Sequence, residues 1–403
     1  MKHIVFVIGN YKNGGVAMRS TNLANAFAEK GYNVTILVTK TISENVFFEH
    51  HENVDVIELS KYIEEHKNDK TIVNYLKKQQ FKIRVIKLVR YATRFFKNFD
   101  LNLAEVIKSI RKSQDLSVFV LNNKKSLYIT FGIGCYEKTF SVVKPFGSKI
   151  IYAERNASEV EFPEESDKRS RLINLVVKAD GVVLQTKDEL KFYEGKLKNS
   201  AVINNPVKED LPEKYIGERR KVIVNFCRIS NQKNLPLLFE AMQKLHKDYP
   251  EYVLEIYGNT VEKHEEELLK EYKELIKAWN AESYIKLLPP SKDVHKIIRD
   301  CAMFVSSSDF EGLSNSMIEA MAIGLPCVCT DCLGGGAREM ITDGENGLLV
   351  PMNDPESLYQ AMKRFIEDPE LAEKCSKNAE KKREELSLPV IADKWLKYIE
   401  SVT

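Results

Sequence analysis

Short runs of hydrophobic residues alternate along this chain with longer segments whose hydrophobic positions recur every three or four residues. Apolar runs at 3–9 and 32–39 enclose a segment with helical periodicity that ends at Gly31, and the turn before that segment reads NYKNGG. Uninterrupted apolar runs are typical of strands buried on both faces of a parallel sheet. The first forty residues therefore predict a strand–turn–helix–strand unit.

The same rhythm continues in two series. Further strands are predicted at 126–132, 148–154 and 180–186, and an Asn-Pro turn follows at 205–206. The second series starts at 221–229 and continues with strands at 252–258, 284–288, 302–308, 325–331 and 346–352, and with helices at 235–246 and 265–279. We predict two doubly wound α/β domains that face a central cleft, over about 1–207 and about 208–385. The amphipathic helix at 386–403 can pack back on either domain, and we expect the amino-terminal one.

Length and composition support this division and exclude some classes. The chain has 403 residues, 43% of them hydrophobic, and a net charge of +2. At roughly 150 residues per domain, two domains are the simplest interpretation. The near-neutral charge argues against a nucleic-acid partner. No signal-peptide pattern and no run of roughly 18 apolar residues is found, which favours a cytoplasmic protein.

Seven cysteines are then expected to be thiols in a reducing compartment. Cys327, Cys329 and Cys332 have a spacing that superficially resembles a metal cluster. Because most of this segment is an apolar run, we interpret them as small core residues and predict no metal site.

A basic segment interrupts the rhythm at about 77–97. It has eight Lys or Arg residues and no acid. On a helix, one face of this segment would carry the apolar residues Phe81, Val85, Leu88, Ala92 and Phe95. Another face would carry the basic residues Lys87, Arg90, Arg94 and Lys97. Such a helix suits an anionic membrane surface, such as the inner face of the plasma membrane. The alternative is an ordinary helix packed on its own domain with a solvated basic face.

Candidate ligand-binding residues follow the predicted strands, where ligands bind in parallel sheets. Gly14 and Gly15 precede the first helix, which suits close approach of an anion or simply a tight turn. Arg228 and Lys233 follow the first strand of the second domain and would bind a diphosphate. Glu311 lies in a loop and Glu319 in the next helix, and a carboxylate can accept two hydrogen bonds from vicinal hydroxyls. Gly334–Gly336 form a second potential phosphate cradle.

Four segments together carry a resemblance to a known family: RISNQKN, SDFEGLSNSMIEAMAIGLPCVCTD, GGGAREMI and GENGLLVP. They resemble the carboxyl-terminal domain of family-four retaining glycosyltransferases with the GT-B fold, of the type that builds bacterial polysaccharides and lipid-linked oligosaccharides. The resemblance is strong over about 222–365, weaker over 1–40 and 148–207, and nearly absent over 41–125. The two glutamates of E-x7-E are in register with R-x4-K-N upstream and the glycine run downstream, and this combination is specific.

The resemblance implies a role for each matching residue. Arg228 and Lys233 should hold the pyrophosphate of a nucleotide sugar, with uridine as the expected base, and stabilise it as it leaves. Glu311 should contact the hexose, Glu319 the ribose, and the backbone near Leu288 the base. The implied donor-binding set is Gly14, Gly15, Arg228, Lys233, Leu288, Glu311, Gly312, Leu313, Ser314, Asn315 and Glu319, of which Glu311, Arg228 and Lys233 are the catalytic residues. The family needs no metal or cofactor for this transfer.

One departure concerns the amino-terminal domain. Many relatives have a histidine that faces the sugar at the end of a strand, where this chain has Glu154, Arg155 and Asn156. These three become the candidate hexose or acceptor contacts. The predicted activity is retaining transfer of a hexose or N-acetylhexosamine to a lipid-linked or glycan acceptor, with domain closure about 204–210. A sugar-nucleotide epimerase and a non-catalytic nucleotide-sugar-binding protein are the alternatives.

Overall fold

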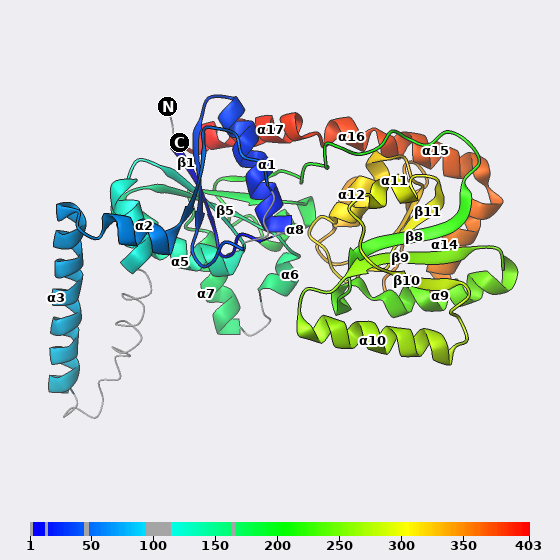
Figure 1. Cartoon of the computed structure of the whole chain (residues 1–403), viewed down its shortest axis with the longest axis horizontal. Coiled ribbons are helices and arrows are strands. Elements are labelled where there is room, and N and C mark those ends of the chain that lie inside the picture. Colours follow the sequence, from blue (N-terminus) through cyan, green and yellow to red (C-terminus); the bar gives the residue numbers. More distant parts are fainter. Residues whose placement is uncertain (1–2, 13–14, 44–47, 94–113, 163–165) are drawn as a thin grey trace.

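The computed structural model describes residues 3–12, 15–43, 48–93, 114–162 and 166–403. These residues form two α/β domains that lie side by side (Figure 1). Each domain has one parallel sheet, and every strand pairing within both sheets is parallel. Two doubly wound domains were predicted, and the structure confirms this fold class.

The amino-terminal sheet has the strand order β3-β2-β1-β4-β5-β6-β7. Its strands are β1 (His3–Ile8), β2 (Asn33–Val38), β3 (Val54–Glu58), β4 (Leu127–Phe131), β5 (Lys149–Ala153), β6 (Gly181–Leu184) and β7 (Ser200–Val202). Its helices are α1 (Gly15–Glu29), α2 (Leu59–His66), α3 (Lys70–Thr93), α5 (Ile133–Val143), η1 (Lys144–Phe146), α6 (Ser158–Glu161), α7 (Ser166–Val176) and α8 (Lys187–Phe192). The order reverses between β1 and β4, which opens a crevice at the carboxyl end of β1.

The carboxyl-terminal sheet has the order β10-β9-β8-β11-β12-β13 and reverses between β8 and β11. Its strands are β8 (Arg220–Arg228), β9 (Val253–Asn259), β10 (Ile285–Leu288), β11 (Cys301–Ser306), β12 (Cys327–Thr330) and β13 (Leu348–Val350). The helices are η2 (Asn231–Lys233), α9 (Leu235–Asp248), α10 (Lys263–Ala278), α11 (Val294–Ile298), α12 (Asn315–Ala322), α13 (Gly336–Met340), α14 (Pro355–Glu367), α15 (Pro369–Glu380), α16 (Lys382–Glu385) and α17 (Leu388–Val402).

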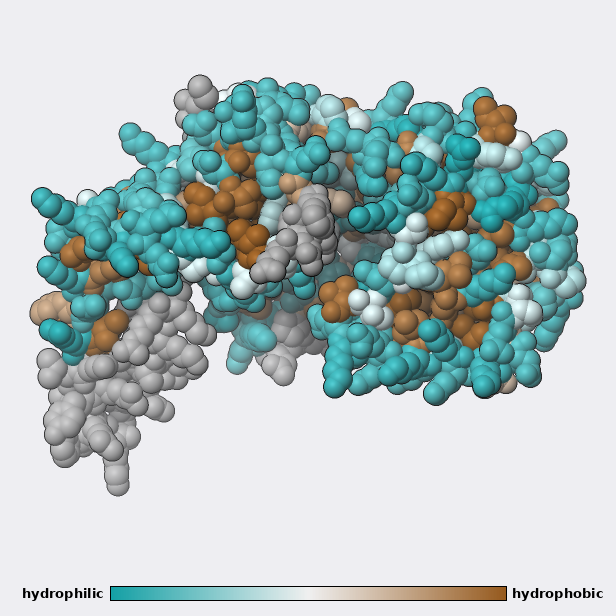
Figure 2. Space-filling view, viewed as in Figure 1, coloured by the Kyte–Doolittle hydropathy of each residue, from teal (hydrophilic) through white to brown (hydrophobic). Residues whose placement is uncertain are grey.

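Alternate residues of the central strands bury opposite faces of each sheet. In β1, Ile4 and Phe6 belong to one core, while Val5 and Val7 belong to another on the opposite face. The core that contains Ile4 continues into the carboxyl-terminal domain, so it joins the two domains. The opposite face of the second sheet has its own core with α9, α10 and α14. On the face seen in Figure 2, hydrophilic side chains cover most of the surface.

Cys327 and Cys329 lie in β12 and are buried, as is Cys332. All seven cysteines are free thiols. The prediction that these three are small core residues is confirmed.

Strand β3 and helix α2 are among the elements of the amino-terminal domain that were not predicted. Strand β3 lies at the edge of its sheet and is only partly buried, and α2 follows it without a break. Partial burial leaves no continuous apolar run, so the pattern used for the other strands was missing here. None of the described helices combines the length and apolarity that crossing a membrane would require.

The last helix, α17, returns to the amino-terminal domain and packs on α1 (Figure 1). The backbone N–H of Val182 in β6 donates to the Tyr398 hydroxyl at 2.8 Å, and that hydroxyl donates to the carbonyl of Asn199 at 3.0 Å. Where the chain crosses between the domains, the N–H of Val207 donates to the carbonyl of Leu386 at 2.9 Å. The carboxyl terminus thus closes the connection between the two domains.

Replacing Tyr398 with Phe should lower the free energy of unfolding by about 0.5–1.5 kcal/mol, because the hydroxyl loses its hydrogen bonds to the N–H of Val182 and the carbonyl of Asn199, while that N–H keeps its bond to the Asn199 carbonyl. Urea denaturation measures this loss. Tyr215→Phe is the control, since its hydroxyl donates to the nearby Glu218 carbonyl at the exposed surface. Equal stability of the two variants would show that Tyr398 does not fasten α17.

Candidate active site

A cavity of about 730 Å³ lies between the two domains and has walls from both. This volume is in the range of ordinary small-molecule sites, roughly 300–1,000 Å³. One wall is formed by the end of β8, the loop after β11 and the start of α12, and the other by the start of α1 and the segment after β5. The cavity therefore lies at the carboxyl ends of strands beside both topological switch points, where ligands bind in this type of sheet.

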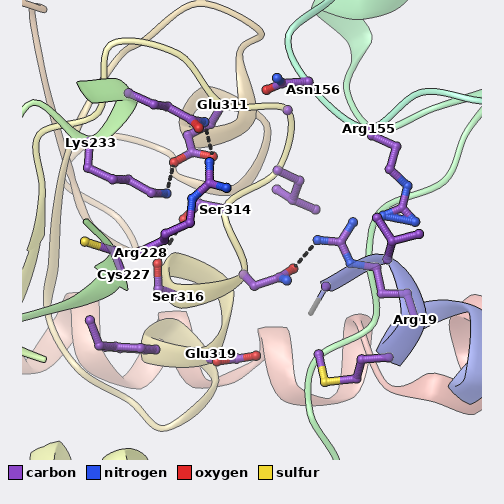
Figure 3. A pocket seen from close by; sticks show the side chains of 18 of the residues that line it. Arg19, Arg155, Asn156, Cys227, Arg228, Lys233, Glu311, Ser314, Ser316 and Glu319 are labelled. Carbon is purple, nitrogen blue, oxygen red and sulfur yellow. Dashed lines mark hydrogen bonds and ion pairs between the residues drawn. The ribbon is translucent and has the colours of Figure 1, made fainter. Parts of the chain in front are cut away.

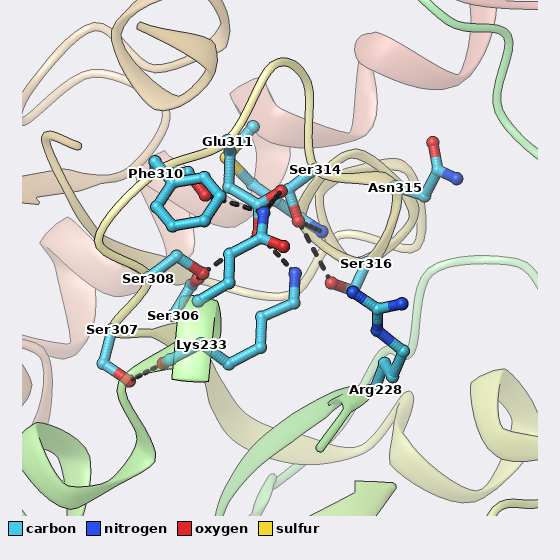
Figure 4. A network of polar contacts seen from close by, with 12 residues as sticks. Arg228, Lys233, Ser306, Ser307, Ser308, Phe310, Glu311, Ser314, Asn315 and Ser316 are labelled. Atoms are coloured by element: carbon cyan, nitrogen blue, oxygen red, sulfur yellow. Dashed lines mark hydrogen bonds and ion pairs between the residues drawn. The ribbon is translucent and has the colours of Figure 1, made fainter. Parts of the chain in front are cut away.

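Lys233 and Glu311 form an ion pair in the carboxyl-terminal wall (Figure 4). The Glu311 carboxylate also accepts from Ser308 Oγ at 3.0 Å and from Gln232 Nε2 at 3.2 Å. Burial alone would lower the pKa of Lys233, but the adjacent Glu311 carboxylate more than offsets this and the pKa is raised. The ammonium group of Lys233 therefore stays charged at neutral pH, with further N–H donors for a ligand.

Arg228 lies at the end of β8, and its Nε is 3.2 Å from Oε1 of Glu265. Glu265 is buried in the first turn of α10, where its other oxygen accepts from the N–H groups of Val261 and Glu262. This support from α10 fixes the start of the Arg228 side chain, which is 47% exposed and borders the cavity.

Helix α12 carries the second glutamate of the motif. Ser314 caps the helix by accepting from the N–H of Met317. Glu319 lies one turn further on and faces the cavity. His295 of α11 donates from Nε2 to its carboxylate at 2.9 Å, and this contact orients the Glu319 side chain.

The opposite wall comes from the amino-terminal domain (Figure 3). Gly15 lies at the start of α1, and a Cβ there would come within 3.8 Å of the Asn315 amide. Arg19 Nη2 donates to Asn315 Oδ1 at 2.8 Å, which joins α1 directly to α12. Arg155 and Asn156 follow β5 and line the same side. The two domains are thus in hydrogen-bonded contact at the cavity.

Glycines at the rim allow this close approach. A Cβ on Gly336 would meet the Gly312 carbonyl, and a Cβ on Gly312 would meet the Gln185 side chain. Gly335 has a left-handed φ of 71°, and a Cβ on it would lie 2.5 Å from the carboxylate of Asp188. Gly334–Gly336 are not among the residues that line the cavity. The prediction of a second phosphate cradle at these glycines is therefore wrong: they are small because two loops and two domains meet there.

The structure brings most of the predicted site residues together. The predicted residues that line the cavity are Gly15, Arg155, Asn156, Arg228, Lys233, Glu311, Gly312, Leu313, Ser314, Asn315 and Glu319. Gly14 lies outside the described residues. Leu288 ends β10, two strands away from β8, and is not in the lining. Glu154 is buried behind the wall, so of its triplet only Arg155 and Asn156 face the cavity.

Sequence reasoning missed several contributors. Arg19, Gln232 and Ser316 line the cavity, and Glu265 and His295 support two of the predicted residues from behind. Gln232 and Ser316 lie inside the motifs already chosen, so the motifs themselves were the available signal. Arg19, one turn beyond Gly15 in α1, could have been found as the one basic residue on a helix of mostly small and apolar residues.

Comparison with known proteins agrees with this geometry. Residues 207–382 match the family described as glycosyl transferases group 1. An uncharacterized glycosyltransferase of Haemophilus influenzae is 26% identical over 98% of this chain and 99% of its own length. A Campylobacter jejuni enzyme is 35% identical over 46% of this chain and 48% of its own length. It is named N-acetylgalactosamine-N,N'-diacetylbacillosaminyl-diphospho-undecaprenol 4-alpha-N-acetylgalactosaminyltransferase.

Among solved structures, HepE of Anabaena, crystallised with UDP and glucose, covers 99% of both chains with a TM-score of 0.75 and 15% identity. The fold is therefore GT-B. Residues 207–382, in the carboxyl-terminal half of the chain, match the group 1 glycosyltransferases, and the chain as a whole has the GT-B fold of its structural neighbours. The resemblance inferred from the motifs is confirmed.

The buried Glu154 predicts a pH dependence of stability. Burial raises the pKa of Glu154 from its ordinary 4.5 to about 7. Because the pKa of Glu154 is higher in the folded than in the unfolded chain, its contribution to the free energy of unfolding depends on pH. That contribution is complete below the unfolded pKa of 4.5 and is lost as the pH rises through 7. Glu154→Gln should therefore be more stable than the unmodified chain by about 3 kcal/mol near pH 8.5, and the difference should disappear below pH 4.5.

Urea denaturation across this pH range measures the difference. Glu137→Gln is the control, because Glu137 is 41% exposed beside Arg171. An effect of Glu154→Gln that does not change with pH would show that the carboxylate is not held in a desolvated site.

Proposed function

We propose that the protein is a retaining, metal-independent hexosyltransferase that moves a hexose or N-acetylhexosamine from a uridine diphosphate sugar to a lipid-linked or polysaccharide acceptor. The observation that carries this proposal is the cavity in which Arg228, Lys233 and Glu311 of one domain face Gly15 and Asn156 of the other. The proposal rests on this arrangement together with the family and the GT-B fold.

The leaving group would be stabilised by fixed positive charge. Departure of a nucleoside diphosphate leaves negative charge on its terminal phosphate, and preorganised cations in a partly dry site lower the cost of that charge. Lys233 is held by Glu311, and Arg228 by Glu265, so both point at the cavity before a donor binds. These two cations would supply the charge that a metal ion supplies in other transferases, so the proposal needs no metal.

The two glutamates would position the donor. Glu311 lies beside Lys233, so a sugar bound to the terminal phosphate would reach its carboxylate. Glu319 lies deeper along α12, and its carboxylate would accept hydrogen bonds from the ribose hydroxyls. Ser314, Ser316 and the N–H groups at the start of α12 lie between them and would donate toward the phosphates.

The acceptor would enter from the amino-terminal side. Arg155 and Asn156 form this side of the cavity, in the position where many relatives carry a histidine. The Campylobacter jejuni relative is named for transfer to a glycan on diphospho-undecaprenol. We extend the same acceptor class, a glycan or lipid-linked glycan, to this chain.

Replacing Lys233 with Ala should lower kcat/KM for donor-dependent transfer by about 10²–10³-fold, because one preorganised charge at the leaving phosphate is lost. The assay measures release of UDP from a panel of UDP-sugars with membrane lipid extracts or glycans as acceptors. Lys221→Ala is the matched control, since Lys221 is 55% exposed and pairs with Glu251 at the surface. Undiminished transfer by Lys233→Ala would overturn the site assignment.

The same assay separates the two alternative functions. Conversion of the donor into another UDP-sugar in the absence of acceptor would identify an epimerase. Donor binding without turnover over the whole acceptor panel would identify a non-catalytic binding protein.

We also propose that α3 contacts an anionic membrane surface, which would place the enzyme at the cytoplasmic face of the plasma membrane. The helix projects from the amino-terminal domain (Figure 1). On its described surface, Phe81 is 67% and Val85 is 41% exposed, while Ile72 and Ile83 are buried. Exposed cations surround the two apolar side chains: Lys77, Lys78, Lys82 and Arg84. Of the longer predicted stripe, Phe95, Arg94 and Lys97 lie outside the described residues.

Vesicles rich in phosphatidylserine should retain the protein, and reversing two charges in Lys78→Glu/Lys82→Glu should reduce retention at least about tenfold, at about 1 kcal/mol per cation. Sedimentation with vesicles measures this binding. Lys273→Glu/Lys277→Glu is matched in spacing and exposure on α10 of the other domain. Equal retention of both double variants, or none of the unmodified protein, would refute the contact.

A further inference from the structure

Two half-buried arginine side chains in the amino-terminal wall of the cavity lack sufficient partners. Nε of Arg19 and Nη2 of Arg155 are buried and have no hydrogen-bond partner. Neither guanidinium forms an ion pair with any carboxylate of the described residues. Buried charged donors without an acceptor are costly, so their presence at a ligand cavity favours an anion as their partner.

The surroundings of Arg19 leave its charge unneutralised. Its one side-chain hydrogen bond among the described residues is donated by Nη2 to the neutral amide oxygen of Asn315. Burial lowers the pKa of Arg19 to about 10, and Glu319 and Glu311 act on it only from across the cavity. The bond to Asn315 fixes the direction of the guanidinium but contributes no opposite charge.

Arg155 is in the same situation. Its guanidinium lies 4.1 Å from the centre of the Phe131 ring, which stabilises a cation but accepts no hydrogen bond in the plane of the group. Burial lowers its pKa, and the positive charge of Arg19 lowers it further. The neighbouring carboxylates bond to other groups: Glu154 accepts from Tyr152 Oη and from the N–H of Arg155, and Glu161 accepts from the N–H of Ile133.

Figure 3 shows the two guanidinium groups next to each other, on the side of the cavity opposite Arg228 and Lys233. The cavity thus has two separate pairs of cations, one in each domain. The carboxyl-terminal pair already has the carboxylates of Glu311 and Glu265 beside it. Among the described residues, no carboxylate forms an ion pair with the amino-terminal pair, and one buried nitrogen of each arginine has no hydrogen-bond partner.

We propose that Arg19 and Arg155 form a second anion subsite, which binds a phosphate group of the acceptor while the donor diphosphate occupies Arg228 and Lys233. Two guanidinium groups side by side present several N–H donors in fixed directions and match the oxygens of one phosphate. A dianionic phosphate neutralises both charges, whereas a carboxylate neutralises one. This inference rests on the proposed function and specifies its acceptor as a phosphate-bearing glycan or lipid.

The test is a calorimetric titration of inorganic phosphate and of glycerol 3-phosphate into the full chain saturated with UDP. Both should bind, and Arg155→Gln and Arg19→Gln should each weaken binding at least about tenfold, because charge-assisted hydrogen bonds are lost. The affinity for UDP should not change. Arg171→Gln, an exposed arginine of the same domain that pairs with Glu137, should bind phosphate as the unmodified chain does.

Thermal unfolding distinguishes an anion site from a structural role. Without phosphate, Arg155→Gln should unfold at the same or a higher temperature than the unmodified chain, because it removes one of two like charges buried together. Phosphate should raise the unfolding temperature of the unmodified chain and leave that of the variant unchanged. A variant that is destabilised and still binds phosphate normally would show that Arg155 is structural and would overturn the proposal.

Two further outcomes decide the source of the anion. Phosphate that competes with UDP would assign both arginines to the donor. Phosphate that does not bind the UDP-saturated chain at all would assign them to no anion. Either outcome would overturn the proposal. If UDP itself does not bind, the donor assignment fails instead. The phosphate titration is then run on Arg228→Ala/Lys233→Ala, where binding that disappears on adding Arg155→Gln would still support the second subsite.

Discussion

The ion pair between Lys233 and Glu311 is the constraint on which the site depends. It joins η2, the short helix that follows β8, to the loop after β11, and β8 and β11 are the two strands at the switch point of the carboxyl-terminal sheet. Both side chains are largely buried, so their charges would be expensive without partners. Ser308 and Gln232 complete the hydrogen bonds of the carboxylate, and this network holds the lysine at the cavity wall with its charge intact.

The loop that carries Glu311 is in turn fixed by contacts that only small residues allow. The N–H of Glu311 donates to the carbonyl of Leu333, and the glycines at 312, 334 and 336 let their loops touch backbone to backbone. The N–H of Leu313 then donates to Gln185 Oε1, and Thr186 Oγ1 donates to the carbonyl of Gly334. The geometry of the ion pair is therefore linked to the position of the amino-terminal domain.

Most of the fold could be predicted because its strands are buried on both faces and read as continuous apolar runs. Strand β3, at a half-exposed edge, lacks that signal. The residues at strand ends, Arg228, Lys233 and Glu311, were found because topology places such ends together. Arg19, Glu265 and His295 were not found, since they reach the cavity or its supports from other helices and only the packing of those helices brings them near. The glycine run at 334–336 was misassigned because a requirement for close packing and a requirement for phosphate binding favour the same residue.

The central claim is that the cations around Lys233 bind a nucleoside diphosphate through its terminal phosphate. The most direct measurement is the ratio of the dissociation constants of UMP and UDP for the unmodified chain and for Lys233→Ala. UDP should bind at least about tenfold more tightly than UMP to the unmodified chain, through charge-assisted hydrogen bonds to the second phosphate, and this preference should largely disappear in the variant. Equal binding of UMP and UDP by the unmodified chain, or a preference for UDP that survives the loss of Lys233, would contradict the account.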